Sequence, residues 1–218
     1  MMKIFTPVFL FALIPGFVFS QSVGIRPASL TLGVNVKETD KDGKMPLGTK
    51  MAVYCKNPNP SVKGKINVVR FYIGEDGIYN APFKVHIYSL NVADSAPGKD
   101  LILDNLVVSA NKKGWFEVNV AKYNIDAPAE GFFVAMDWIF TKEEYKQDTV
   151  KYKSNGEDYT TQGYGQTIGT VTDRPDLGSV TFFKSLEGHR WGRFSLPDEQ
   201  GKRHIINALM QAEVSVTN

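Results

Sequence analysis

Hydrophobic and polar residues alternate along several short stretches of this chain. The stretch 30–36 (LTLGVNV) places an apolar residue at every second position, which is the period of a strand with one buried face. Comparable runs occupy 51–56 (MAVYCK), 65–73 (KINVVRFYI), 83–90 (FKVHIYSL), 101–109 (LILDNLVVS), 115–120 (WFEVNV), 179–183 and 205–216. The period of a helix is not sustained anywhere. Thr141 and Glu144 have capping-box spacing and predict one short helix over 141–147.

Turn residues separate these runs. Clusters of Asp, Asn, Pro and Gly predict turns at 39–43 (TDKDG), 57–60 (NPNP), 74–77 (GEDG) and 96–99 (APGK). The short connection 110–114 predicts a hairpin between the strands 101–109 and 115–120. The run 131–140 (GFFVAMDWIF) is almost wholly apolar and predicts a central strand covered on both faces. The expected fold is therefore all-β: a single antiparallel β-sandwich, jelly-roll-like.

One segment departs from this pattern. Residues 145–169 (YKQDTVKYKSNGEDYTTQGYGQTIG) are polar and rich in Gly, Thr, Gln and Tyr, and are expected to form one long polar loop. Loops of this length are usually functional or disordered, or they carry a short hairpin. Tyr152, Tyr159 and Tyr164 offer an apolar face and a polar tip, which suits contact with a sugar or a peptide. A solvated surface loop is the alternative interpretation.

The N-terminus has the features of a secretory signal peptide. Lys3 precedes the apolar stretch 4–19, which Pro15 and Gly16 interrupt, and Ser20 marks a plausible cleavage position. A membrane span needs about 20 apolar residues without such breakers. The expected organisation is a signal peptide over 1–20 and a single domain over 21–218. The mature protein would then be exported to the periplasm, the cell surface or the medium, without a membrane span after cleavage.

Charge and cysteine content narrow the possibilities further. The chain has 25 Lys and Arg residues against 23 Asp and Glu residues, which gives no electrostatic argument for a nucleic-acid partner. Cys55 is the only cysteine, so no internal disulfide can form and stability must come from a packed core. Its position in an apolar run predicts a small buried hydrophobic residue, with a reactive thiol as the alternative.

The central part of the chain resembles a known kind of module. The succession VVRFYI, PFKVHIYSLN, APGKDLILDNLVVS, GWFEVNV and EGFFVAMDWI over 68–140 is similar to jelly-roll modules of exported Gram-negative bacterial proteins. Some of those modules are attached to carboxypeptidase-regulatory-like domains. The resemblance covers about a third of the chain, and its motifs are packing motifs. It implies a sandwich fold, export and, more remotely, glycan binding, and it transfers no catalytic residue.

Motifs of familiar chemistry are missing from the sequence. No HExxH, CxxC, nucleophile elbow, dinucleotide fingerprint or phosphate loop is present. His86, His189 and His204 are not at metal-ligand spacing, and 38–43 only imitates half of a calcium loop, so no metal or cofactor is expected. In 188–193 (GHRWGR), Trp191 stands beside arginines, either as a contact residue or as a packed aromatic side chain.

Alternation within two strands predicts a candidate binding face. If Phe116 and Val118 face the core, Trp115, Glu117 and Asn119 share the opposite face. The same reasoning places His86 and Tyr88 opposite Val85 and Ile87. If both strands belong to one sheet, aromatic rings, an amide and a carboxylate meet there, as sugar binding requires. The predicted ligand-binding residues are Trp115, Glu117, Asn119, His86, Tyr88, Tyr159 and Tyr164.

Three functions remain open from the sequence. The first is a non-catalytic exported sandwich that binds a glycan or a cell-envelope partner. The second is a glycoside-type hydrolase with paired carboxylates, for which Glu117 and Asp137 are the candidates. Asp137 lies inside an apolar strand, where a structural ion pair or hydrogen bond is the competing explanation. The third is a structural or assembly component of the cell envelope.

Overall fold

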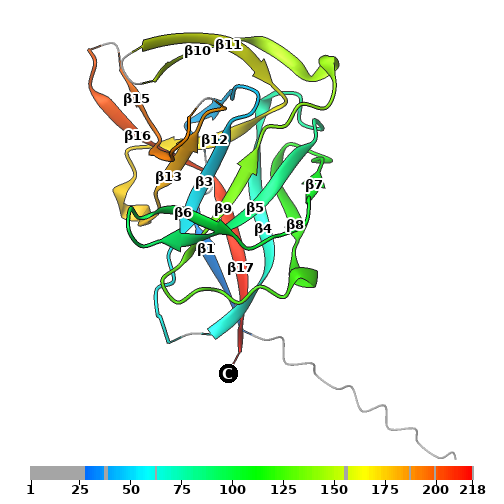
Figure 1. Cartoon of the computed structure of the whole chain (residues 1–218), viewed down its shortest axis with the longest axis vertical. Coiled ribbons are helices and arrows are strands. Elements are labelled where there is room, and N and C mark those ends of the chain that lie inside the picture. Colours follow the sequence, from blue (N-terminus) through cyan, green and yellow to red (C-terminus); the bar gives the residue numbers. More distant parts are fainter. Residues whose placement is uncertain are drawn as a thin grey trace, which may run out of the picture.

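The computed structural model describes residues 28–36, 39–61, 63–154, 157–186, 188–198 and 200–217. These residues form an all-β structure in which two antiparallel sheets face each other (Figure 1). The only helical elements among them are single 3-10 turns at η1 (Ala121–Tyr123), η2 (Glu143–Tyr145) and η3 (Pro175–Leu177). The predicted all-β, antiparallel sandwich is confirmed. The predicted signal peptide 1–20 lies outside the described residues.

The first sheet has eight strands and runs in the order β1-β17-β4-β12-β16-β15, with β2 added beside β12 and β8 beside β4. Its strands are β1 (Ser29–Gly33), β2 (Lys41–Gly43), β4 (Lys63–Gly77), β8 (Gly114–Asn119), β12 (Gln166–Thr172), β15 (Ser195–Pro197), β16 (Arg203–Ala208) and β17 (Met210–Thr217).

The second sheet has seven strands in the order β14-β13-β3-β9-β5-β6, with β7 added beside β5. Its strands are β3 (Lys50–Cys55), β5 (Phe83–Asn91), β6 (Ala96–Asp100), β7 (Val107–Val108), β9 (Phe132–Asp137), β13 (Thr181–Lys184) and β14 (Gly192–Arg193). A separate hairpin of β10 (Lys146–Ser154) and β11 (Glu157–Tyr164) lies beyond one end of the two sheets (Figure 1).

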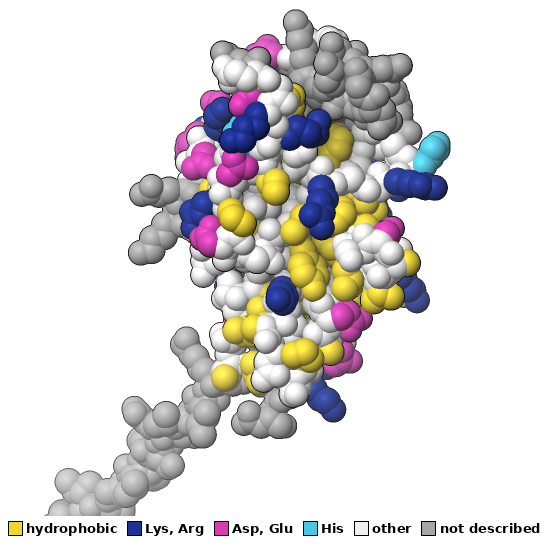
Figure 2. Space-filling view, turned by 90° about the vertical axis from the view of Figure 1, so that its left-hand side faces the viewer, with side chains coloured by type: hydrophobic (Ala, Val, Ile, Leu, Met, Phe, Trp, Pro, Cys, Tyr) yellow, Lys and Arg dark blue, Asp and Glu magenta, His cyan; other side chains and the backbone are white. Residues whose placement is uncertain are grey.

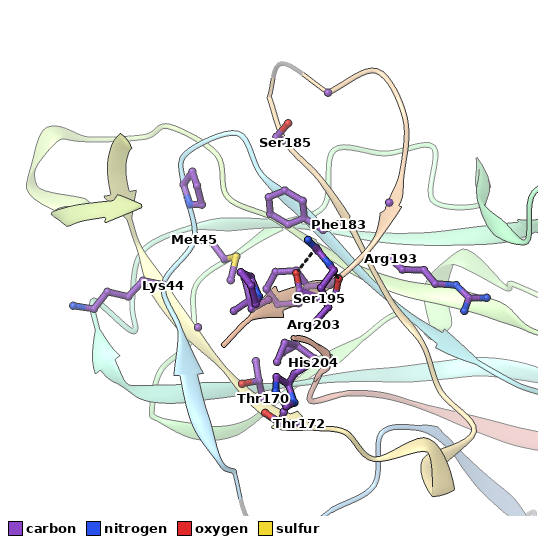
Figure 3. Close-up of a pocket in the computed structure, with 18 of the residues that line it drawn as sticks. Lys44, Met45, Thr170, Thr172, Phe183, Ser185, Arg193, Ser195, Arg203 and His204 are labelled. Atoms are coloured by element: carbon purple, nitrogen blue, oxygen red, sulfur yellow. Dashed lines mark hydrogen bonds between the residues drawn. The ribbon is translucent and has the colours of Figure 1, made fainter. Parts of the chain in front are cut away.

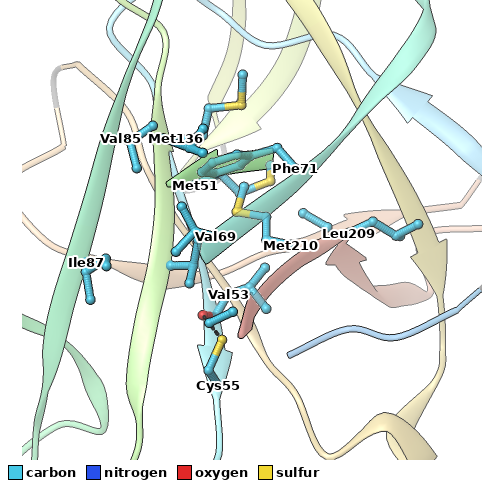
Figure 4. Close-up of a cluster of buried hydrophobic side chains, with 14 of the residues drawn as sticks. Met51, Val53, Cys55, Val69, Phe71, Val85, Ile87, Met136, Leu209 and Met210 are labelled. Atoms are coloured by element: carbon cyan, nitrogen blue, oxygen red, sulfur yellow. Dashed lines mark hydrogen bonds between the residues drawn. The ribbon is translucent and has the colours of Figure 1, made fainter. Parts of the chain in front are cut away.

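The core lies between the two sheets. Alternate residues of β3, β5 and β9 meet alternate residues of β4 and β17, and Figure 4 shows Met51, Phe71 and Met210 converging there from three strands. A second, smaller cluster covers the outer face of the seven-stranded sheet and contains Ala52, Tyr88, Ala96, Phe133, Ala135 and Phe182. Because β9 contributes to both clusters, its six residues are all buried. This confirms the central strand that the apolar run 131–140 predicts.

Of the predicted strand 101–109 only β7 is a strand, and the predicted hairpin over 101–120 is wrong. Val107 and Val108 pair with β5 in the seven-stranded sheet, whereas the next strand, β8, pairs with β4 in the other sheet. The chain therefore crosses from one sheet to the other at 109–113. Short connections permit this crossing as readily as a hairpin, and the partner of each strand is set by long-range packing.

The polar segment 145–169 is not a loop. It folds into the β10–β11 hairpin and then enters β12, which lies in the eight-stranded sheet between β4 and β16. The predicted helix over 141–147 shrinks to the 3-10 turn η2, because Lys146 already pairs with Tyr164 in the hairpin. Thr and Tyr favour strands on a half-exposed surface, and here this preference prevails over the capping-box spacing.

Three predicted turns lie wholly or partly within strands, and one of them, 74–77, is the end of β4. Residues 96–99 belong to β6, which pairs with β5, and the turn lies just before them, where Ser95 has a positive φ of 56°. Residues 41–43 form β2 against β12. The Asp42 carboxylate accepts hydrogen bonds from the backbone N–H groups of Glu75 and Asp76. Strand pairing and these hydrogen bonds therefore account for residues 41–43 of the stretch that imitates half of a calcium loop.

Candidate functional site

A groove of about 1180 Å³ is lined by residues of both sheets (Figure 3). One wall is the segment 41–46, and the other is 188–198 together with Phe183 and Ser185. Between the walls, alternate residues of β12 and β16 line the groove: Thr170, Thr172, His204 and Ile206. Pockets for small molecules usually measure about 300–1,000 Å³, so this groove is large enough for an extended ligand.

Phe194 connects the two sheets along one side of the groove. Its N–H donates to the Thr181 carbonyl in β13 at 2.8 Å, and its carbonyl accepts from Ile206 in β16 at 3.2 Å. Its ring stacks on Phe183, with the centroids 5.6 Å apart and an angle of 22° between the planes. Both rings are partly exposed. The backbone therefore holds a parallel aromatic pair in place beside the groove.

Trp191 also lines the groove, but its ring packs on the outer face of the seven-stranded sheet, whereas Phe183 and Phe194 pack against the core between the sheets. It is partly exposed and packs edge-on against Tyr88, at 5.7 Å between the centroids and 68° between the planes. A smaller hollow of about 190 Å³ adjoins the groove and is lined by Tyr54, Leu90, Ser95, Val180, Phe182 and Arg193. Figure 2 shows this side of the molecule, where hydrophobic side chains gather with Lys and Arg side chains around them.

Positive charge is concentrated along the groove. Its lining includes Lys41, Lys44, Arg190, Arg193 and Arg203, against the two carboxylates Asp42 and Asp198. Within the described part of the chain, Lys41, Arg190 and Arg193 have no ion pair or side-chain hydrogen bond, whereas both carboxylates are engaged. Lys44 and Arg193 extend outward from opposite sides of the groove (Figure 3). Among the described residues, the groove thus presents three cations without an anionic partner.

His204 stands between two carboxylates at one side of the groove. Its Nδ1 lies 2.5 Å from Asp173 Oδ2, and its Nε2 lies 3.0 Å from Asp198 Oδ2. Hydrogen bonds with Asp198 and Asp173 raise the pKa of His204, and His204 in turn lowers the pKa of both carboxyl groups. Asp198 also accepts backbone N–H groups from Gln200 and Lys202. This arrangement fixes the turn between β15 and β16.

The predicted binding face divides into two separate surfaces. Trp115, Glu117 and Asn119 alternate with core residues as predicted, but they lie on the outer face of the eight-stranded sheet. His86 and Tyr88 lie on the outer face of the seven-stranded sheet. The condition that both strands share one sheet is not met, because β8 pairs with β4 and β5 pairs with β9. The core lies between the two sets, so they cannot contact one ligand molecule together.

The residues of each surface have internal partners. Arg70 donates to Glu117 at 2.6 Å and to Glu213 at 2.6 Å, which forms a charged triad across β8, β4 and β17. Trp115 packs edge-on against Tyr72 at 5.5 Å. Asn119 is exposed and accepts from the Ala121 N–H. This surface is therefore a set of paired side chains without a described hollow.

Tyr164 is a structural residue. Its side chain is only 1% exposed, and its hydroxyl group accepts hydrogen bonds from the N–H groups of Thr141 and Lys142 and donates to the Lys142 carbonyl. It anchors the end of the β10–β11 hairpin and is unavailable to a ligand, contrary to the sequence prediction. The side chains of Tyr152 and Tyr159 lie outside the described part of the structure.

Asp137 belongs to a buried charged cluster on the outer face of the seven-stranded sheet. Its Oδ2 lies 2.8 Å from Lys50 Nζ and 3.5 Å from His86 Nε2, and His86 Nδ1 lies 2.6 Å from Asp100 Oδ2. Glu117 is on the outer face of the other sheet. The two carboxylates that the hydrolase hypothesis paired are thus separated by the whole core. This separation leaves the structural explanation for Asp137.

The groove was not predicted as the main site, although one signal for it was present in the sequence. The segment 188–193 (GHRWGR) combines a tryptophan with two arginines, and all three of these side chains line the groove. Phe183, Phe194 and Thr170 lie in other strands, and only the tertiary structure brings them to the same place. In the described ranges there is no cluster of three or more His, Cys, Asp or Glu side chains that could hold a metal ion.

Comparisons with protein-family models, curated proteins and solved structures gave no match. The chemistry of the groove is therefore the basis for inferring the function. Among the described residues, no helix has the length and apolar character needed to cross a membrane.

Proposed function

We propose that this protein is an exported binding protein whose groove holds a glycan without chemical turnover. One observation carries the proposal: an open groove of about 1180 Å³ in which aromatic rings and many hydrogen-bonding side chains line the same space. Sugar rings present C–H groups that pack on aromatic faces and hydroxyl groups that need donors and acceptors. The predicted N-terminal signal peptide and the resemblance to exported jelly-roll modules support the exported location.

The aromatic wall supplies the apolar contact. Phe183 and Phe194 are partly exposed, and the backbone hydrogen bonds of Phe194 hold this stacked pair of rings beside the groove. Trp191 also lines the groove, from the side of Tyr88. Thr170, Thr172, Ser185 and Ser195 add hydroxyl groups around it. The volume of the groove, above that of usual small-molecule pockets, suits several sugar units of a polymer better than one monosaccharide.

The test is a glycan and envelope-polysaccharide binding screen with purified residues 21–218. We expect saturable binding that Trp191→Ala weakens by about tenfold or more, since stacking on a ring contributes on the order of 1 kcal/mol or more. Trp115→Ala is the matched control, because Trp115 is also a partly exposed tryptophan but lies on the far sheet. Folding of each variant is checked by circular dichroism.

Two results would contradict the proposal. The first is absence of binding across the panel by a folded protein, which would favour a protein partner and a structural role. The second is loss of binding in Trp115→Ala with normal binding in Trp191→Ala, which would move the site to the eight-stranded sheet.

A further inference from the structure

We infer that the groove selects an acidic glycan, one whose sugars carry carboxylate or phosphate groups, and that Arg190 and Arg193 bind these acidic groups. The inference rests on the proposed glycan-binding function and goes beyond it by naming the class of ligand. It is based on the distribution and pairing of charged side chains around the groove.

The charge balance of the groove differs from that of the whole chain. All 218 residues together carry a formal net charge of +2. The described lining of the groove alone has five Lys or Arg side chains and two Asp side chains, an excess of three positive charges. Lys44 pairs with Asp148, which is outside the lining, at 3.9 Å, and the remaining positive side chains along the groove concentrate a positive potential there.

Neither carboxylate in the described lining is paired with a lysine or arginine of the groove. Asp42 accepts the N–H groups of Glu75 and Asp76, and Asp198 accepts His204 together with two backbone N–H groups. Arg203 is occupied as well, since its guanidinium donates to the Ser195 hydroxyl and carbonyl groups. Arg190, Arg193 and Lys41 are exposed, and within the described residues they are free to meet an anion.

The positions of the arginines suit a sugar acid. Arg190 and Arg193 flank Trp191 in sequence, and all three line the groove. Arg193 also lines the adjoining hollow, together with the aromatic side chains of Tyr54 and Phe182. A guanidinium group binds a carboxylate or a phosphate through two parallel hydrogen bonds. A ligand that packs on the aromatic side chains of the groove would therefore bring an acidic substituent close to the guanidinium groups of Arg190 and Arg193.

The experiment compares glycans that differ only in charge. Calorimetric titrations use oligogalacturonate and its methyl ester for carboxylate, and phosphorylated and unphosphorylated mannan oligosaccharides for phosphate. At low salt we expect at least one acidic member to bind about tenfold or more tightly than its neutral counterpart. This preference should shrink as salt rises, because exposed charges are screened within about 10 Å at 0.1 M ionic strength.

Substitutions test which side chains bind the acidic groups of the glycan. Arg190→Gln/Arg193→Gln should weaken binding of the acidic glycan by about tenfold and leave the neutral glycan within about twofold. Lys56→Gln/Lys112→Gln removes the same number of charges from exposed positions outside the groove lining and should change neither affinity.

The outcomes separate the two proposals. Equal binding of acidic and neutral partners, still weakened by Trp191→Ala, overturns the acidic preference and leaves glycan binding intact. An equal loss of acidic binding in the control double variant also overturns it, because the effect would then be one of net charge. If no member of either pair binds, the inference is overturned. If no glycan in the wider screen binds, the proposed glycan-binding function is overturned as well.

Discussion

Lys50 and Asp137 form an ion pair between the neighbouring strands β3 and β9, with Nζ 2.8 Å from Oδ2. The Asp137 side chain is only 10% exposed, so its charge depends on this partner and on His86. A carboxylate in a central strand looked like a possible catalytic group in the sequence. Its surroundings show a charge held in place by partners from both neighbouring strands.

Removal of the Asp137 carboxylate should destabilise the fold. Asp137→Ala leaves Lys50 and His86 without their partner in a mostly buried site, and we expect a loss of about 2–4 kcal/mol in the free energy of unfolding. Urea denaturation measures it. The control is Asp126→Ala, which breaks an exposed pair with Lys65 of similar length, 2.7 Å, and should cost less than about 1 kcal/mol. Equal losses in the two variants would contradict this account.

The same cluster predicts how stability depends on pH. Burial lowers the pKa of His86, but hydrogen bonds with Asp100 and Asp137 outweigh it and raise the pKa. Burial raises the pKa of Asp137, but hydrogen bonds with His86 and Lys50 outweigh it and lower the pKa. The contribution of His86 is complete below its unfolded pKa of about 6.5 and is lost as the pH rises through its folded pKa. The contribution of Asp137 is present above its unfolded pKa of about 3.9 and is lost as the pH falls through its folded pKa.

The cluster should therefore stabilise the protein most between about pH 4 and 6.5. We expect the wild-type protein to lose more stability than His86→Phe as the pH rises above that window, since Phe keeps a ring against Tyr88 but cannot titrate. Urea denaturation at several pH values measures the difference. His204 is present in both proteins, so its own titration cancels. If the stability of the two proteins changes equally with pH, the titration of His86 is not the cause of the pH dependence.

The hydroxyl group of Tyr164 should stabilise the attachment of the β10–β11 hairpin. Tyr164→Phe removes the acceptor of the Thr141 and Lys142 N–H groups, at 2.8 and 3.0 Å, and we expect a loss of about 1–2 kcal/mol. Hydrogen exchange at these two amides should accelerate. Tyr79→Phe is the control, because Tyr79 is 38% exposed, and it should change stability by less than about 0.5 kcal/mol. Unchanged exchange at 141–142 would refute the anchoring role.

Cys55 should be unreactive in the folded protein. It is fully buried, and burial raises the pKa of its thiol to about 12, so the reactive thiolate is scarce at pH 8. A thiol-specific reagent should modify it only as fast as the protein opens, and completely in denaturant. Rapid modification under native conditions would contradict the burial and restore the alternative of a reactive thiol.

The hydrophobic pattern of the sequence determined the strands and the faces of several of them. Alternation correctly separated Val118 from Glu117, and the apolar run 131–140 correctly marked a strand with both faces covered, because side-chain direction alternates locally along a strand. The buried role of Cys55 followed from the same local pattern.

The partner of each strand was decided only by the tertiary structure. Trp115 and His86 occupy predicted faces of predicted strands, yet the pairing of β8 with β4 and of β5 with β9 puts the whole core between them. The groove gathers Lys41, Thr170, Phe183, Trp191 and His204 from distant parts of the chain. Strand pairing depends on which faces pack together across the core, so residue spacing along one strand carries no information about it.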